Sequence, residues 1–235
     1  MRRHRPGLEA GSSVSVILPT LNEADRIAGA VASLRRLGPC EIIVADGGSA
    51  DDTLRRASGA DLVLSAPRCR AAQMNHGAAH ARGDIFVFLH ADCSLEAGAF
   101  EAARRSLARP GVAAGCFRMT VTASGLAYRL IDAAATLRVR LTGIAYGDQG
   151  LFVRRDAFAR VGGFPPVSFM EDVFVSRALR RIGRVVVAPA RVHVSDRRWS
   201  KVGLVRQTLR NWTLTALAVA GVPADRLARH YPAVR

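Results

Sequence analysis

The residues best suited to chemistry are polar side chains that directly follow apolar runs. Asp92 comes just after the run 85–89 (IFVFL), and His90 stands two positions before it. Side chains alternate along an extended segment, so His90 and Asp92 point to the same side. An imidazole and a carboxylate together suit a divalent cation, manganese rather than calcium. We therefore predict a metal site at these two residues. Helix capping by Asp92 is the alternative, and Ser94 could cap equally well.

A glycine-containing loop follows the run 41–45 (EIIVA). Asp46 and Gly47 begin this loop, which reads DGGSADD over residues 46–52. Glycine permits a tight turn and lets a ligand approach the backbone amides. The Asp46 carboxylate can accept hydrogen bonds from a uracil-type imide or from ribose hydroxyls. The loop therefore indicates a nucleoside site, with an ordinary strand-to-helix turn as an equal alternative.

Two arginines, Arg68 and Arg70, stand just before a predicted helix. Guanidinium groups and free amides at a helix N-terminus can hold phosphates. Lys201 is the only lysine among the 34 basic residues, so arginine is common everywhere in this chain. Two solvated arginines are therefore a serious alternative.

A pair of adjacent carboxylates, Glu171 and Asp172, precedes an apolar helical face. One carboxylate of such a pair can orient the other or shift its pKa, which suits a general base. The alternative is a negative pair that is favoured at a helix N-terminus by the helix dipole.

The elements that must position these residues alternate between strand and helix. Strand-like runs at 14–18, 41–45, 61–66 and 85–89 are separated by helical patterns, and Asn22 could cap the first helix. Such alternation predicts a parallel sheet with helices on both faces, whose sites lie beyond the carboxyl ends of the strands. A further helix is predicted at 95–107, and the second half predicts strands at 112–121, 185–188 and 192–195 and helices at 126–141, 171–182 and 201–219.

We expect a single α/β domain over residues 12–222. Its nucleotide-binding half would span 12–109 and its acceptor half 110–222, with a disordered leader at 1–11 and a tail at 223–235. No apolar run reaches the roughly 18–20 residues of a membrane span. The four cysteines form no CxxC pair, which favours reduced thiols in a cytoplasmic protein.

The net charge of +15 raises the question of nucleic-acid binding. The arginines are spread along the chain and not gathered into one stripe, and aromatic residues are only 6% of the total, so we expect no nucleic-acid partner. A basic surface favours anionic substrates or the face of an anionic membrane.

Taken together, the motifs resemble family 2 of the nucleotide-sugar glycosyltransferases. The resemblance runs from Val14 to Trp212 and rests on residues 16–23 (VILPTLNE), 44–51 (VADGGSAD), 90–92 (HAD) and 171–172 (ED). His90 stands in place of the first aspartate of the family's DxD motif. The segments 73–75 (QMN), 147–149 (GDQ) and 197–199 (RRW) resemble a bacterial subgroup associated with radical-SAM and selenium-related genes.

The resemblance implies a GT-A fold, a UDP- or GDP-sugar donor, an Mn²⁺ or Mg²⁺ ion at Asp92 and His90, and inverting transfer with Asp172 as base beside Glu171. The residues expected on the donor side are Pro19, Thr20, Leu21, Asn22, Glu23, Asp46, Gly47, Arg68, Arg70, Gln73, Asn75 and Ala91. Those expected on the acceptor side are Asp148, Gln149, Arg197, Arg198 and Trp199. The acceptor and the oligomeric state are not predicted.

Two alternatives share the early motifs. One is a polyprenyl-phosphate sugar synthase that contacts the inner face of the membrane peripherally. It would need an apolar, basic-flanked surface, for which residues 128–141 and the last helix near Trp212 are candidates, although we expect both to pack in the core. The other is a non-catalytic nucleotide-sugar-binding module, which should have lost Asp92 or Asp172, yet both are present.

Overall fold

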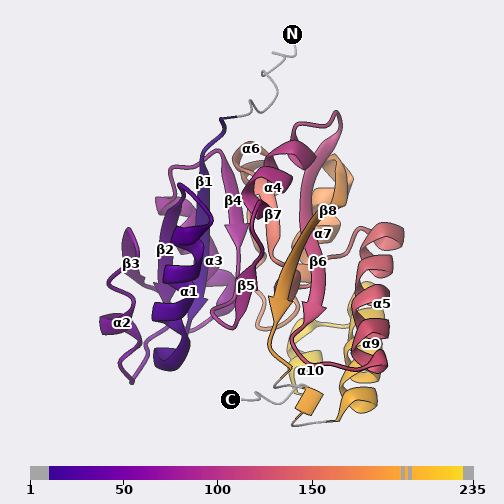
Figure 1. Ribbon diagram of the computed structural model, residues 1–235. Helices are drawn as coiled ribbons and strands as arrows, with labels where there is room; N and C mark the ends of the chain where they lie inside the picture. Colours follow the sequence, from indigo (N-terminus) through magenta and orange to yellow (C-terminus); the bar gives the residue numbers. More distant parts are fainter. Residues whose placement is uncertain (1–10, 197–198, 201–202, 230–235) are drawn as a thin grey trace.

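A computed structural model describes residues 11–196, 199–200 and 203–229, so the expected leader lies almost entirely outside the described residues. Within them the strands form one eight-stranded sheet in the order β3-β2-β1-β4-β7-β6-β8-β5 (Figure 1). The strands are β1 (Val14–Thr20), β2 (Glu41–Asp46), β3 (Leu62–Ser65), β4 (Ile85–Phe88), β5 (Cys93–Leu95), β6 (Val112–Val121), β7 (Leu151–Arg154) and β8 (Arg184–Val194).

The first four strands are parallel, as the sequence predicts. β1 pairs with β2 on one side and with β4 on the other, and β3 extends the sheet beyond β2. Every residue of β4 is buried, which explains why this strand is a continuous apolar run with no polar alternation. The carboxyl ends of these strands therefore meet at one edge of the sheet, where the predicted polar residues lie.

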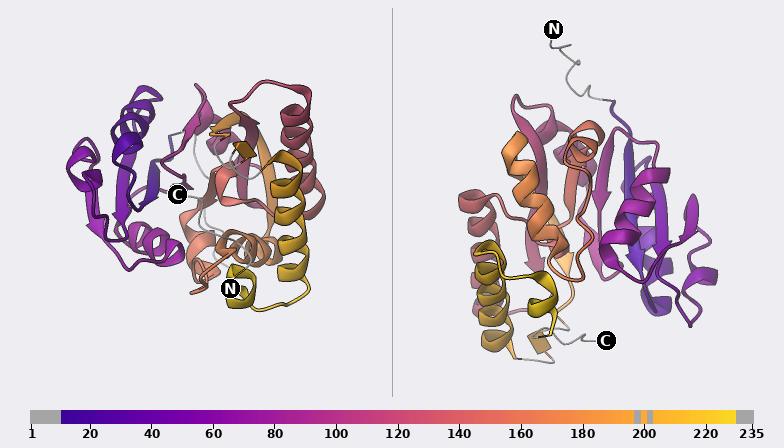
Figure 2. Two further views of the ribbon diagram at one scale, coloured as in Figure 1. Left: turned by 90° about the horizontal axis from the view of Figure 1, so that it is seen from below. Right: turned by 180° about the vertical axis from the view of Figure 1, so that it is seen from behind.

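Helices cover both faces of the sheet (Figures 1 and 2). One core cluster lies under α1 and α4, and a second lies under α3, α6 and α7. The helices are α1 (Ala24–Arg36), α2 (Thr53–Arg56), α3 (Arg70–His80), α4 (Ala99–Leu107), α5 (Leu126–Thr142), the 3-10 turn η1 (Gly147–Gln149), α6 (Arg155–Arg160), α7 (Glu171–Ile182), α9 (Leu204–Val219) and α10 (Ala224–Ala228). The expected architecture, a mostly parallel sheet covered by helices on both faces, is confirmed.

The fold differs from the prediction in three places. Residues 93–95 form the short strand β5 and not the first turn of a helix, because they pair with β8. The two strands expected at 185–188 and 192–195 are one strand, β8, which follows β6 with two register shifts. The short helix α10 lies in the expected tail.

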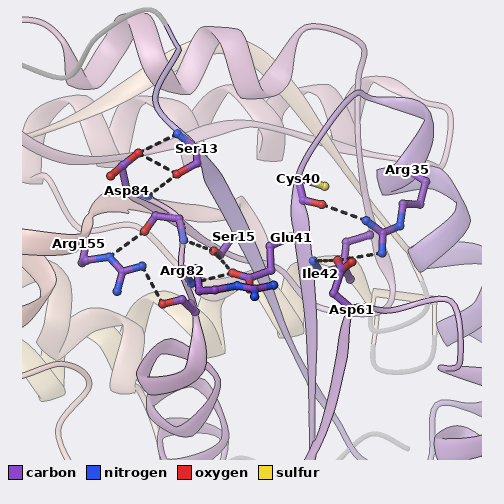
Figure 3. A network of polar contacts seen from close by, with 12 residues as sticks. Ser13, Ser15, Arg35, Cys40, Glu41, Ile42, Asp61, Arg82, Asp84 and Arg155 are labelled. Carbon is purple, nitrogen blue, oxygen red and sulfur yellow. Dashed lines mark hydrogen bonds and ion pairs between the residues drawn. The ribbon is translucent and has the colours of Figure 1, made fainter.

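The amino ends of the strands are tied together by polar side chains (Figure 3). Ser15 Oγ accepts the Gly83 amide at 2.8 Å, and Glu41 accepts the Arg82 amide and guanidinium at 2.8 and 2.9 Å. Asp84 Oδ2 accepts the Ser13 amide at 2.9 Å. Hydrogen bonds from Ser13 lower the pKa of Asp84. These contacts join β1, β2 and the entrance to β4, so this edge of the sheet is structural and the opposite edge carries the candidate site.

The expectation that residues 128–141 and the last helix near Trp212 pack in the core is confirmed for Val139 and Leu214, which are buried, but not for the leucines of α5 and for Trp212. Leu126 and Leu141 of α5 are 77% and 72% exposed, and Trp212 of α9 is 49% exposed. The reason is that α5 packs against the sheet through the smaller side chains of Ala135 and Val139, which leaves its leucines on the outer side. None of the described helices is both long and apolar enough to span a bilayer.

Candidate functional site

A pocket at the carboxyl edge of the sheet brings together segments that are far apart in the sequence. It is lined by Arg70, His90, Tyr146, Gly147, Asp148, Phe169, Met170, Asp172, Val173 and Asn211. These residues come from the start of α3, the end of β4, η1, the start of α7 and the middle of α9. The predicted metal, base and phosphate residues are therefore neighbours in space.

His90 and Asp92 lie close together, and Cys93 joins them. One potential ligand atom from each of the three residues lies within 4.8 Å of the others. Asp92 does not begin a helix, because β5 follows it and α4 starts only at Ala99, after the left-handed Gly98. An imidazole nitrogen beside a carboxylate oxygen fits Mn²⁺ better than Mg²⁺, whereas the Cys93 thiol is a softer ligand than either ion prefers.

Asp172 lies at the start of α7, and two backbone amides hold its carboxylate in place. Its Oδ2 accepts the Gly147 amide at 2.6 Å, and its Oδ1 accepts the Val173 amide at 2.7 Å. Met170, just before the helix, has a φ of 60°, a left-handed conformation that is uncommon for residues other than glycine. Each carboxylate oxygen keeps a further lone pair, so Asp172 can still accept a proton from a ligand.

The environment of Asp172 prepares it to exchange a proton near neutral pH. Burial and the adjacent Glu171 carboxylate raise the pKa of Asp172 to about 7, against the opposing effect of the Gly147 amide. Glu171 is 2% exposed and accepts a hydrogen bond from Arg70 Nη1 at 3.1 Å. Within the acid pair, the Glu171 carboxylate is thus ion-paired with Arg70. The Asp172 carboxyl group has a pKa close to neutral pH, where it can exchange a proton.

Arg70 and Arg68 differ in their surroundings. The side chain of Arg70 is 43% exposed, lines the pocket and ion-pairs with Glu171. Arg68 is exposed in the loop before α3 and lies outside the pocket lining. Among the two predicted phosphate ligands, Arg70 is therefore the one that the structure brings to the acid pair.

The predicted nucleoside loop is built around Asp46, which is 1% exposed. Its carboxylate accepts the amides of Gly48 and Ser49 at 2.9 and 2.8 Å and the Thr20 hydroxyl at 3.1 Å. Gln73 Nε2 donates to the carbonyls of Thr20 and Ala45, at 2.6 and 2.9 Å. Asp46 and Gln73 therefore hold the shape of the loops that follow β1 and β2.

The remaining donor-side residues lie at the end of β1 and in the loop that follows it, in α3, and directly after β2 and β4. Asn22 does not cap α1 as expected, because its Oδ1 accepts the Ala50 amide at 2.9 Å and its own φ is 55°. Asn75 binds both the amide and the carbonyl of Phe164, at 2.9 and 2.8 Å. The partly exposed residues that are open to a ligand are Pro19, Leu21 and Glu23, whereas Gly47 and Ala91 are buried.

The residues expected on the acceptor side lie in different surroundings. Asp148 lines the main pocket and also a second pocket, which Trp199 lines as well. Gln149 is fully buried, and its Oε1 accepts the Tyr146 amide at 3.2 Å and a hydrogen bond from Arg138. Arg197 and Arg198 lie outside the described residues.

Seven pocket or metal residues were not among the predicted site residues, namely Cys93, Tyr146, Gly147, Phe169, Met170, Val173 and Asn211. Gly147 is the most informative, because a Cβ atom there would lie 2.9 Å from His90 Nε2. Only glycine lets η1 approach the imidazole this closely while its amide binds Asp172. The available signals were the motif 147–149 (GDQ), which contains Gly147, and the adjacency of Cys93 to Asp92.

Comparison with solved structures places the fold among sugar-transferring proteins. A mannosyltransferase from Pyrobaculum calidifontis, in complex with GDP-Man and Mn²⁺, superposes with a TM-score of 0.68 at 22% identity, over 94% of this chain and 69% of that one. Glucosyl-3-phosphoglycerate synthase from Mycobacterium tuberculosis, with Mn²⁺ and UDP, gives 0.60 at 22% identity, over 94% and 88%. S. aureus TarS with UDP-GlcNAc gives 0.61 at 18% identity, over 78% and 58%.

The family itself is established from sequence. A search of curated proteins gives no significant match. The model of Glycosyl transferase family 2, however, matches residues 15–162, which is more than half of the chain and includes β1, the Asp46 loop and the His90–Cys93 segment. Together with the GT-A architecture of the solved neighbours, this match shows that the chain belongs to glycosyl transferase family 2.

Proposed function

We propose that this protein transfers a sugar from a nucleoside-diphosphate sugar to an acceptor hydroxyl, with inversion at the anomeric carbon. The observation that carries the proposal is the meeting of Asp172, Arg70 and His90 in one pocket at the carboxyl edge of the sheet. The pKa of Asp172, raised to about 7 by burial and by Glu171, supports its role as the base. The resemblance to the radical-SAM-associated subgroup stays a prediction.

In the proposed reaction, Asp172 accepts the proton of the acceptor hydroxyl while that oxygen attacks the anomeric carbon. The bond between the anomeric carbon and the diphosphate oxygen breaks, and the nucleoside diphosphate leaves. The amides of Gly147 and Val173 fix the orientation of the Asp172 carboxylate. Arg70 lies where its guanidinium can stabilise the charge on the departing phosphates, since nearly half of its side chain is exposed to the pocket.

A divalent cation held by Asp92, His90 and Cys93 would neutralise the diphosphate of the donor. The solved neighbours that contain Mn²⁺ together with GDP-Man or UDP support this assignment and support a GDP- or UDP-sugar donor. The loops around Pro19 and Asp46 would hold the nucleoside.

The same sugar transfer has an alternative acceptor, a polyprenyl phosphate at the membrane surface. The observation behind it is the exposed apolar side of α5 and α9, next to the pocket. None of the four cysteines, which all lie within the described residues, forms a disulfide, and this fits a location at the cytoplasmic face. A non-catalytic binding module is disfavoured, because the acid pair and the three candidate metal ligands all remain near the pocket.

The test is thermal unfolding with UDP or GDP, with and without Mn²⁺, combined with hydrolysis of the matching nucleotide sugars. A saturating nucleotide should stabilise the parent by about 2–3 kcal/mol at a hundredfold excess over Kd, and only with metal present. Asp92→Ala should lose this stabilisation, whereas Asp25→Ala on α1 should keep it. Asp172→Asn should keep it and lose about 10²–10⁴-fold in turnover.

An equal metal-dependent response from Asp92→Ala and the parent would remove the metal assignment. Unchanged turnover in Asp172→Asn would remove the base assignment. A parent protein that binds none of the nucleotides with metal present would contradict the proposed donor class.

A further inference from the structure

The outward side of α5 is apolar along its whole length. Leu126, Leu130, Leu137 and Leu141 are 77%, 62%, 54% and 72% exposed. Their spacing of four, seven and four residues places them in one stripe of the helix. The inward side packs Tyr128, Ile131, Ala135 and Val139 on the core, and Asp132 Oδ1 accepts the Val121 amide at 3.0 Å. An ordinary surface helix is polar on its outward side, whereas α5 is apolar on both sides.

The last long helix, α9, also exposes large apolar side chains on one side, while it buries Leu214 and Ala218 on the other. Leu209, Trp212, Leu217 and Val219 are 40–55% exposed, while Gln207 and Thr215 are buried. α9 lies beside α5 at the end of the sheet away from β3, as Figures 1 and 2 both show. The two helices also share the second pocket, which is lined by Ile131 and Ala135 of α5 and by Thr208 and Trp212 of α9. We call the eight exposed residues of the two helices the leucine face.

The charges around the leucine face are positive. Arg129 and Arg140 of α5 and Arg206 of α9 are exposed. Asp132 is the only carboxylate in the two helices, and it is turned inward to the Val121 amide. A second copy of this chain would bring a like-charged face, and each chain has a net charge of +15. An apolar stripe with an arginine rim is complementary to a layer that is apolar inside and anionic at its surface.

The leucine face adjoins the candidate site. The second pocket, between α5 and α9, and the main pocket share Tyr146, Asp148 and Asn211. Tyr146 also reaches α9 through a hydrogen bond of 2.5 Å between its hydroxyl and that of Thr215. A layer that covers the leucine face would therefore lie next to the pocket that holds Asp172.

We propose that the leucine face docks on the surface of an anionic lipid bilayer. The leucines and Trp212 enter the boundary between headgroups and acyl chains, and the arginines contact lipid phosphates. This proposal rests on the proposed function for its purpose, because docking presents the candidate site to an acceptor carried by the membrane. The docking itself requires neither donor nor metal.

The test is co-sedimentation of the full chain with vesicles of phosphatidylcholine alone or of phosphatidylcholine with phosphatidylglycerol. The parent should bind the anionic vesicles, and binding should weaken as salt screens the arginines. The double variant Leu130→Gln/Leu137→Gln should bind about tenfold more weakly, because two leucines no longer enter the bilayer. The matched control is Leu54→Gln, on the short helix α2, where Leu54 is 46% exposed. It should bind like the parent.

Equal loss of binding in Leu54→Gln and the double variant would overturn the proposal, as would absence of binding to anionic vesicles. A dimer in solution that the double variant separates, without vesicle binding, would identify a second copy as the true occupant. Asp92→Ala should bind vesicles like the parent, and the double variant should keep metal-dependent stabilisation by nucleotide. Failure of the docking proposal is thereby distinguished from failure of the proposed chemistry.

Discussion

Asp172 must be deprotonated before it can accept a proton, and its neighbours decide at which pH that occurs. Burial and Glu171 raise the pKa of Asp172 to about 7. The fraction of the base form then increases as the pH rises through 7, so we expect kcat/KM to have an acid limb there. In Glu171→Gln the repulsive charge is gone, the pKa of Asp172 falls, and the limb should move to lower pH. The measurement is the pH profile of kcat/KM in both proteins.

The control for this prediction is Glu101→Gln, which removes an exposed carboxylate from α4 and should leave the profile in place. A limb at the same pH in Glu171→Gln and the parent would show that Asp172 is not the titrating group. Glutamine can still accept the hydrogen bond from Arg70, so the change tests charge and not loss of a contact.

Residue types and order were enough to predict which side chains gather at the site, but not what each one does there. His90, Asp92 and Asp172 were predictable because each follows or starts an element whose end must lie at the carboxyl edge of the sheet. Gln149 was expected on the acceptor side and is buried, because the η1 turn that decides its direction depends on Arg138 and Tyr146. Such contacts between distant segments leave no periodic pattern in the sequence.

Strands and helices were predictable where the residue pattern of a single element is enough to identify it. β1, β2 and β4 are apolar because both of their faces are covered, and α7 was expected with the same bounds, 171–182. β5 was missed because three residues carry no pattern of their own, and its partner strand β8 lies about a hundred residues away. The exposed leucines of α5 were assigned to the core because hydrophobic spacing identifies an apolar face but not what covers it.

The strands on either side of β6 approach Gly115 so closely that they leave no room for a side chain there. A Cβ atom at Gly115 would lie 2.4 Å from the Phe152 ring of β7 and 2.6 Å from the Val186 carbonyl oxygen of β8. Gly115→Ala should therefore destabilise the protein by at least about 2 kcal/mol, since neither neighbour can move without shifting a central strand. Denaturant unfolding measures this change in the free energy of unfolding.

Gly29 provides the matched control, because it is exposed in α1 with no atom within 4 Å of a Cβ at that position. Gly29→Ala should stabilise the protein by about 0.5–1 kcal/mol, because alanine loses less backbone entropy in a helix. Two substitutions of the same type should thus act in opposite directions. Destabilisation of similar size at both positions would contradict the packing argument.

All the described strands belong to one sheet, although the sequence predicts a nucleotide-binding half and an acceptor half. The link is β7, which lies between β4 of the donor half and β6 of the acceptor half. We therefore expect a single cooperative unfolding transition. Both tryptophans, Trp199 and Trp212, lie in the acceptor half, so their fluorescence reports on that half while far-ultraviolet circular dichroism reports on all helices and strands. The two transitions should coincide, and separate midpoints would mean that the halves unfold independently.

The pairing of β5 with β8 also has a consequence for the order of assembly during synthesis. Strands β1 to β4 need only the first 88 residues to become neighbours in the sheet, so the loops at Asn22 and Asp46 can form while the ribosome is still working. The segment that carries Asp92 is different, because Cys93 pairs with Val194. A chain that has not yet reached Val194 can therefore form the loops expected to bind a nucleoside before its candidate metal ligands are fixed, and both parts of the site are in place only after β8 has been made.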